Sequence, residues 1–153
     1  MISEVKKIPT SRLEECLAIF KDDELNKAYN GQVLDWVKTG IRKNELWGAI
    51  SQSGEIIAVM WIEENGFFHE YPYLALIGVK KEYQGQGLGS FLLRVYEAIG
   101  RSLNKSKITL MVGDFNYRAK ELYESVGYKE IGKVESAYMP TIAEYIMMKK
   151  IDN

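Results

Sequence analysis

The segment "YQGQGLGS" (residues 83–90) places Gly85, Gly87 and Gly89 between the apolar stretch "YLALIGV" and the helix-like stretch "FLLRVYEAIGR". Because glycine has no Cβ, successive N–H groups of such a turn can point inward and contact an anion closely. A helix that begins near Leu88 adds its unpaired N–H groups and the positive end of its dipole. The residue types and their spacing therefore suit backbone binding of a phosphate or diphosphate, with no lysine required.

Other interpretations of the glycine-rich turn differ in what they require. A Walker loop needs GxxxxGK[ST], and no lysine follows these glycines at that spacing. A dinucleotide fingerprint needs GxGxxG, whereas the register here is Gly85-x-Gly87-x-Gly89 followed by Ser90. A tight strand-to-helix turn that binds no ligand remains open when only the glycines are considered.

Two segments carry longer motifs. In "VKKEYQGQGLGSFLL", Gln84, Gly87 and Gly89 stand at the fixed positions of a Q/R-x-x-G-x-G/A signature, and this segment resembles the GCN5-related N-acetyltransferase (GNAT) superfamily. "MVGDFNYRAKELYESVGYKEIG" is similar to the strand and helix that follow in the family, with the pattern N-x-x-A-x-x-L-Y-x-x-x-G-[FY]. The matching positions there are Asn116, Ala119, Leu122, Tyr123, Gly127 and Tyr128. The resemblance runs from residue 73 to about residue 132.

This resemblance implies an α/β (α+β) fold in a single domain over residues 1–153. The expected sheet is mixed and mostly antiparallel, with about seven strands, a splayed parallel pair and about four flanking helices. The implied activity is transfer of the acetyl group of acetyl-CoA, the cosubstrate, to a primary amine of a small molecule, peptide or protein. A non-catalytic module of the same fold that binds or senses acyl-CoA is the alternative.

The resemblance also assigns residues to acetyl-CoA, position by position. It implies pantetheine contacts at Ile77 and Val79, pyrophosphate contacts at Gln84, Gly85, Gln86, Gly87, Gly89 and Ser90, and contacts with the other side of the CoA arm at Asn116 and Tyr123. Asn116 and Tyr123 share a helix face, because seven residues are close to two turns of ~3.6 residues. The implied role of Tyr123 is to protonate the departing thiolate. A simple helix cap at Asn116 and a core position for Tyr123 are the alternatives.

The general base is open. Candidates on or just before the central strand are Glu63, Glu64, His69, Glu70, Tyr71 and Tyr73. We expect Glu70 or His69 to be the base. For His69 the reason is that an unperturbed imidazole has a pKa of ~6.5, which suits a base at neutral pH. As a lone histidine beside a turn, His69 is equally well explained as an exposed bystander. Tyr73 stands where some relatives carry glutamate, which leaves the identity of the base undecided.

Composition limits the other functions. The chain has 153 residues, a net charge of −1, one histidine and one cysteine. No nucleic-acid or acidic-membrane partner is expected from this charge, and no metal site from these ligands. The first residues lack the apolar core of a signal peptide, and no apolar run approaches ~20 residues, so we expect a cytoplasmic protein. The aromatic residues permit a homodimer. The resemblance implies that roughly residues 22–44 and 133–145 form the acceptor site. These segments do not distinguish between an aminoglycoside, a polyamine, an amino acid, a peptide N-terminus and a lysine as the acceptor.

Local patterns predict the elements that carry these residues. A capping box at Ser11 and Glu14 predicts a helix whose apolar face includes Cys16. A second helix is expected over 23–38, followed by strands at about 45–51 and 55–63 that join at Ser53-Gly54. Asn65-Gly66 predicts the next hairpin turn.

The second half is expected to alternate strands and helices. The helix after the glycine-rich turn is predicted at about 88–101 and is followed by the strand "KITLMV". The next helix is expected to be capped by Asn116 and ended by Gly127. Two closing strands are predicted around Pro140.

Overall fold

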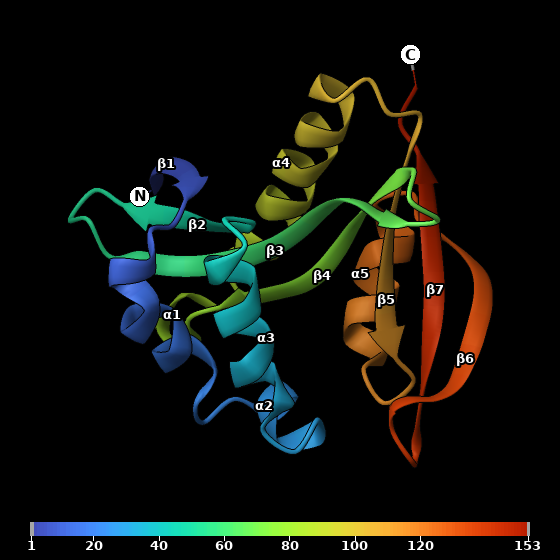
Figure 1. Ribbon diagram of the computed structural model, residues 1–153, viewed down its shortest axis with the longest axis horizontal. Coiled ribbons are helices and arrows are strands. Elements are labelled where there is room, and N and C mark those ends of the chain that lie inside the picture. The colour runs from blue at the N-terminus through green and yellow to red at the C-terminus, as the bar shows by residue number, and fades with distance from the viewer. Residues whose placement is uncertain (1, 153) are drawn as a thin grey trace. The chain divides into compact units, whose positions relative to one another are not determined.

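The computed structural model describes residues 2–152, and Figure 1 labels its helices and strands. In chain order these are β1 (Ile2–Lys7), α1 (Leu13–Phe20), α2 (Glu24–Ala28), α3 (Gln32–Arg42), β2 (Leu46–Ser51), β3 (Ile56–Phe67), β4 (Tyr71–Val79), α4 (Leu88–Ser102), β5 (Lys107–Gly113), α5 (Tyr117–Ser125), β6 (Lys129–Met139) and β7 (Ile142–Lys150). Short 3-10 turns cover Thr10–Arg12 and Lys81–Tyr83.

The strands form one seven-stranded sheet in the order β1-β2-β3-β4-β5-β7-β6. β4 and β5 are parallel, with Tyr73 opposite Thr109 and Leu74 opposite Leu110. The pairs β1–β2, β2–β3, β5–β7 and β6–β7 are antiparallel. This mixed, mostly antiparallel sheet with one parallel pair confirms the predicted fold class. Within residues 2–152, no helix is both long and apolar enough to span a membrane.

The chain divides into two compact units, and β3 and β4 run through both. The first unit comprises residues 1–62 and 76–92. In it, α1 packs against α3, and both lie on the same side of β2 and β3 (Figure 1). Buried apolar side chains fill this unit, among them Phe20, Leu46 and Met60, each at most 1% exposed.

The second unit comprises residues 63–75 and 93–153. Its β5 strand is hydrogen-bonded on one side to β4 and on the other to β7. The buried side chains of Tyr96, Ile108, Leu110 and Met147 form its core. The glycine-rich turn therefore belongs to the first unit, whereas Asn116 and Tyr123 belong to the second.

The start of the first helix and the extent of the second differ from the prediction. The capping box at Ser11 and Glu14 is wrong, because a 3-10 turn after Pro9 delays α1 to Leu13, and no side chain caps it. The helix expected over 23–38 is divided into α2 and α3. Asn30 and Gly31 separate the two helices with φ values of 53° and 83°, a left-handed conformation that no α-helix continues.

The predicted hairpin turn at Asn65-Gly66 is also wrong, since β3 continues through both residues to Phe67. The turn is made instead by Phe68 and His69, with φ values of 55° and 59°. Gly66 has another reason to be glycine: an added Cβ would lie 2.8 Å from Cβ of Glu63 and 2.9 Å from Cβ of Tyr73. Close packing between strands, not turn formation, explains this glycine.

Several local predictions are confirmed. The Ser53-Gly54 turn is present, with Gly54 at φ 89°. Cys16 is fully buried on α1. Asn116 is the N-cap of α5, and Gly127 follows the end of that helix at φ 106°.

Candidate functional site

The glycine-rich turn lies between the end of β4 and the start of α4. Gly85 and Gly87 have φ values of 78° and 81°, which disfavour any residue with a Cβ. A Cβ built at either position meets nothing within 4 Å. These two glycines are therefore required by the backbone conformation and not by packing against a neighbour.

The backbone of this turn and of the first turn of α4 supplies N–H groups for an anion. Residues 84–87 are all exposed. The first hydrogen bond of α4 runs 3.0 Å from Phe91 N to Gly87 O, so the amides of residues 88–90 precede the helical ladder. Helix N-termini of this kind bind phosphate through N–H groups and the helix dipole. The local geometry thus suits an anion, and the diphosphate cradle stays a prediction.

Two glutamine side chains fold back onto the backbone beside the turn. Gln84 Nε2 donates to Val79 O at 3.0 Å, and Gln86 Nε2 donates to Glu82 O at 3.4 Å. Ile77 and Val79, the predicted pantetheine contacts, are half-buried residues at the end of β4. The Gln84 bond therefore ties the turn to the strand that precedes it.

In the second unit, α5 positions Asn116 and Tyr123. Asn116 Oδ1 accepts a hydrogen bond from Ala119 N at 3.3 Å, which is the capping alternative. Tyr123 is 7% exposed, and its ring meets Tyr128 edge-on with 6.0 Å between ring centroids. Burial raises the pKa of Tyr123 to about 12. The phenol is therefore protonated at neutral pH, as a general acid must be before it donates.

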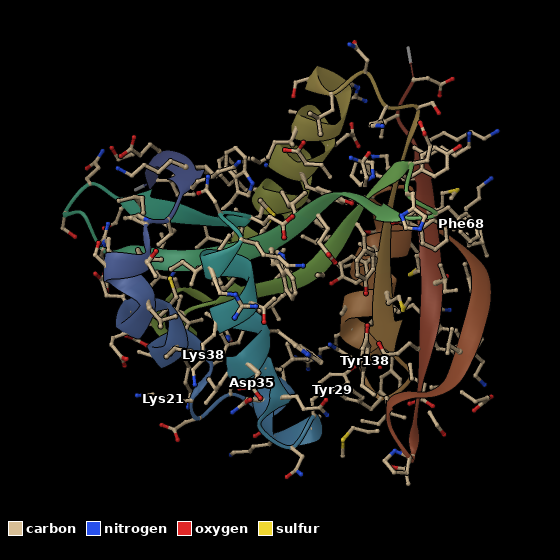
Figure 2. All side chains as sticks on the ribbon, in the orientation of Figure 1. Lys21, Tyr29, Asp35, Lys38, Phe68 and Tyr138 are labelled. Carbon is tan, nitrogen blue, oxygen red and sulfur yellow. The ribbon has the colours of Figure 1, made fainter. Side chains whose placement is uncertain are left out.

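His69 and Glu70, the predicted base candidates, lie at the exposed turn between β3 and β4. Glu70 Oε1 is 3.5 Å from Lys105 Nζ. The neighbouring Phe68, labelled in Figure 2, is 79% exposed. The surroundings of both candidates are thus those of surface residues.

Tyr73, one of the base candidates, interacts with two residues that the sequence did not single out, Tyr138 and Glu144. The Tyr73 hydroxyl is 3.5 Å from that of Tyr138, which is labelled in Figure 2. Burial, Tyr138 and the carboxylates of Glu144 and Glu63 raise the pKa of Tyr73 far above its ordinary value. Glu144 is only 3% exposed, and its position within the apolar run "IAEYIMM" is the signal that was available.

A second missed residue, Tyr96 on α4, connects the two parallel strands. Its hydroxyl donates to Thr109 O at 2.7 Å and accepts from Thr109 N at 3.4 Å. Burial raises the pKa of Tyr96, and hydrogen bonds from the backbone of Thr109 and Leu74 oppose this shift. One hydroxyl thus forms hydrogen bonds with the backbone of both β4 and β5. In the sequence Tyr96 is indistinguishable from any core aromatic of a helix.

The segment of residues 22–44, expected to form part of the acceptor site, carries charges of both signs. Asp35 and Lys38 are both exposed on α3, and both are labelled in Figure 2. Positions three apart on a helix are neighbours, so the acidic charge of Asp35 is accompanied by a basic one. This part of α3 is a solvated helix face of both signs.

A known protein family matches most of this chain. The family described as "Acetyltransferase (GNAT) family" matches residues 11–128, and this chain belongs to it. Thialysine N-epsilon-acetyltransferase of Bos taurus is 36% identical over 63 residues, which cover 41% of this chain and 37% of the relative. The N-acetyltransferase YycN of Bacillus subtilis (strain 168) is 27% identical over 94 residues, 61% of this chain and 60% of the relative. The matched regions thus cover less than two thirds of the length of these relatives.

Solved structures agree on the fold. Ard1 from Thermoplasma volcanium has a TM-score of 0.79 at 15% identity, with 98% of each chain covered. The ribosomal-protein-S18-alanine N-acetyltransferase from Escherichia coli has a TM-score of 0.72 at 20% identity, with 98% of this chain and 94% of that chain covered. At such low identity these likenesses establish the fold alone.

Proposed function

We propose that this chain transfers the acetyl group of acetyl-CoA to a primary amine. The observation that carries the proposal is the turn of residues 84–87, which is exposed, is held in shape by two left-handed glycines and leads directly into the N-terminus of α4. Within residues 2–152, no neighbouring atom lies within 4 Å of the positions where a Cβ would stand at Gly85 and Gly87. Such a turn suits a diphosphate, the group that joins the two halves of CoA.

The proposed cofactor contacts follow the family motifs. The amides of residues 84–90 hold the pyrophosphate, and the backbone of Ile77 and Val79 pairs with pantetheine. Asn116 and Tyr123 contribute from α5, consistent with their places at its start and on its buried face. We further propose that residues 1–153 work as one catalytic domain, since the family match includes parts of both compact units.

The proposed reaction is direct transfer. The neutral amine nitrogen attacks the thioester carbonyl, and the carbonyl oxygen gains negative charge that a backbone N–H near Val79 stabilises; one such donor is typically worth ~10²–10³ in rate. The carbon–sulfur bond then breaks, the acetyl group stays on nitrogen, and CoA leaves as a thiolate. Tyr123 protonates that sulfur, since its buried phenol carries a proton at neutral pH.

The amine must also lose a proton, and we propose Glu70 or His69 as the acceptor, directly or through water. Their exposed positions allow proton exchange with solvent. Substitution of each by glutamine, with the pH–rate profile recorded, tests the assignment. An acidic limb that does not move eliminates that residue as the base.

The alternative is a module that binds acyl-CoA without turnover. Thermal unfolding with acetyl-CoA first tests binding, since a ligand at 100 times its Kd stabilises the fold by ~2.7 kcal/mol. Release of free thiol from acetyl-CoA with a panel of alkylamines then separates the enzyme from the module. Cys16 will not confuse this assay, because it is fully buried and burial raises the pKa of its thiol to about 11. Binding without amine-dependent thiol release favours the module.

A further inference from the structure

Glu55, in the turn between β2 and β3, contacts the segment that leads into the glycine-rich turn. Its Oε1 accepts a hydrogen bond from the Tyr83 hydroxyl at 2.9 Å, and its Oε2 forms an ion pair with Lys80 Nζ. Hydrogen bonds from Lys80 and then from Tyr83 lower the pKa of Glu55. The carboxylate is therefore charged at neutral pH and engaged through both oxygens.

The glycine-rich turn needs such support at its start. Residues 84–87 are exposed, and the positions of an added Cβ at Gly85 and Gly87 are open space. At its far end the turn is fixed by Leu88, which is 5% exposed. At its near end, Tyr83 N donates to Lys80 O at 2.8 Å, so the two partners of Glu55 belong to one 3-10 turn. Glu55 holds the side chains at both ends of this turn.

Glu55 is itself held in place. Ser51 Oγ accepts from Glu55 N at 3.1 Å, and Ser51 N donates to Glu55 O at 2.8 Å. Arg12 Nη2 donates to the adjacent Gly54 O at 2.7 Å and pairs with Glu15 Oε2 at 2.8 Å. The β2–β3 turn is thus fastened to the start of α1, and it presents the Glu55 carboxylate from a fixed backbone.

We propose that Glu55 is a positioning residue that orients the glycine-rich turn for the pyrophosphate of CoA, acting through Tyr83 and Lys80. The inference rests on the proposed function. It makes a counter-intuitive prediction: an anionic residue favours binding of an anionic ligand. By charge alone, removal of Glu55 would strengthen CoA binding, whereas loss of orientation weakens it.

The test compares CoA with pantetheine, which lacks the diphosphate, by calorimetric titration of the full chain. Glu55→Ala is expected to raise the Kd for CoA about threefold to tenfold, a modest change because the contacts are partly exposed. The Kd for pantetheine should stay the same. Glu55→Gln keeps an oxygen for the Tyr83 hydroxyl and should recover most of the CoA affinity.

Glu82→Ala is the matched control for charge. Glu82 belongs to the same 3-10 turn and its carboxylate lies 3.7 Å from Lys80 Nζ, whereas the Tyr83 hydroxyl donates its hydrogen bond to Glu55. This variant should bind CoA as well as the unaltered chain or slightly better. Tyr83→Phe should reproduce part of the Glu55→Ala loss, and adding it to Glu55→Ala should cause no further loss.

Three results would overturn the inference: an unchanged or lower Kd for CoA in Glu55→Ala, equal weakening of CoA and pantetheine, or the same loss in Glu82→Ala. Equal weakening would mean general structural damage. Failure of the unaltered chain to bind CoA would instead refute the proposed function, so the two failures are distinguishable. Thermal unfolding of each variant without ligand verifies that it is folded.

Discussion

Replacement of Gly87 by alanine separates the proposed role of the glycine-rich turn from ordinary stability. Gly87 has φ 81°, and an added Cβ meets nothing within 4 Å. Gly31, at the start of α3, has φ 83° and is equally open. Gly31→Ala is therefore a matched control with the same backbone strain at a site with no proposed contact to CoA.

The expected magnitudes follow from this geometry. A left-handed residue with a Cβ costs about 1–2 kcal/mol, and no steric clash is added at either site. For a chain of this size each kcal/mol lowers Tm by roughly 2–4 °C, so both variants should melt about 2–8 °C lower. CoA at 100 times its Kd stabilises the unaltered chain by ~2.7 kcal/mol, and a tenfold loss of affinity reduces this to ~1.4 kcal/mol.

The assay is thermal unfolding of the three proteins with and without CoA at one fixed concentration. Gly31→Ala should keep the full ligand-induced rise in Tm, and Gly87→Ala should lose about half of it or more. A full rise in Gly87→Ala would refute the reasoning, because it would mean that CoA binds without the turn conformation that only glycine readily adopts. Loss of the rise in both variants would point to general damage and would equally contradict the assignment.

Three further predictions concern Tyr123, Gly78 and Cys16. Tyr123→Phe should lower kcat by ~10²–10⁴ and leave the Kd for CoA nearly unchanged; steady-state kinetics with equal turnover would contradict its role as the acid. In Gly78→Ala the new Cβ would lie 2.2 Å from Cε1 of the buried Phe20. This overpacking should lower the free energy of unfolding, measured with urea, by about 1–3 kcal/mol. The double variant with Phe20→Leu should recover part of that loss. If the losses of the two single variants simply added, the clash with Phe20 would be contradicted. Burial raises the pKa of the Cys16 thiol to about 11 in the folded state. The stability that this shift contributes is complete below the ordinary thiol pKa and is lost as the pH rises through about 11. The free energy of unfolding, measured with urea, should therefore decline less over this pH range in Cys16→Val than in the unaltered chain.

The parts of the fold that depend on neighbouring residues in the sequence were predictable. Asn116 caps α5 and Gly127 follows its end, because both devices act within one helical turn of the chain. The order of strands and helices followed from periodicity for the same reason. The helix predicted over 23–38 was a partial exception. Gly31 was a sign of a break in this helix, but the regular spacing of apolar residues favoured one continuous helix.

Apart from the capping box at Ser11 and Glu14, the other errors and omissions come from contacts between residues distant in sequence. Asn65-Gly66 has the composition of a hairpin turn, but Gly66 is required by the approach of Glu63 and Tyr73, and the turn forms elsewhere. Glu55 and Tyr83 are 28 residues apart, so no motif joins them. The burial of Glu144 likewise arises only when β7 takes its place in the sheet.

The hydroxyl of Tyr96 has a consequence for how the second unit opens. The hydroxyl is hydrogen-bonded to the backbone of Thr109 on β5, and a backbone hydrogen bond from Leu74 on β4 lowers the pKa of Tyr96. Therefore α4 cannot leave the sheet without breaking hydrogen bonds to both strands. A buried polar group that loses its partner destabilises a protein by about 1–3 kcal/mol. Helix undocking and strand separation should therefore form one cooperative step, and deuterium uptake at Thr109 should begin only when α4 also starts to exchange.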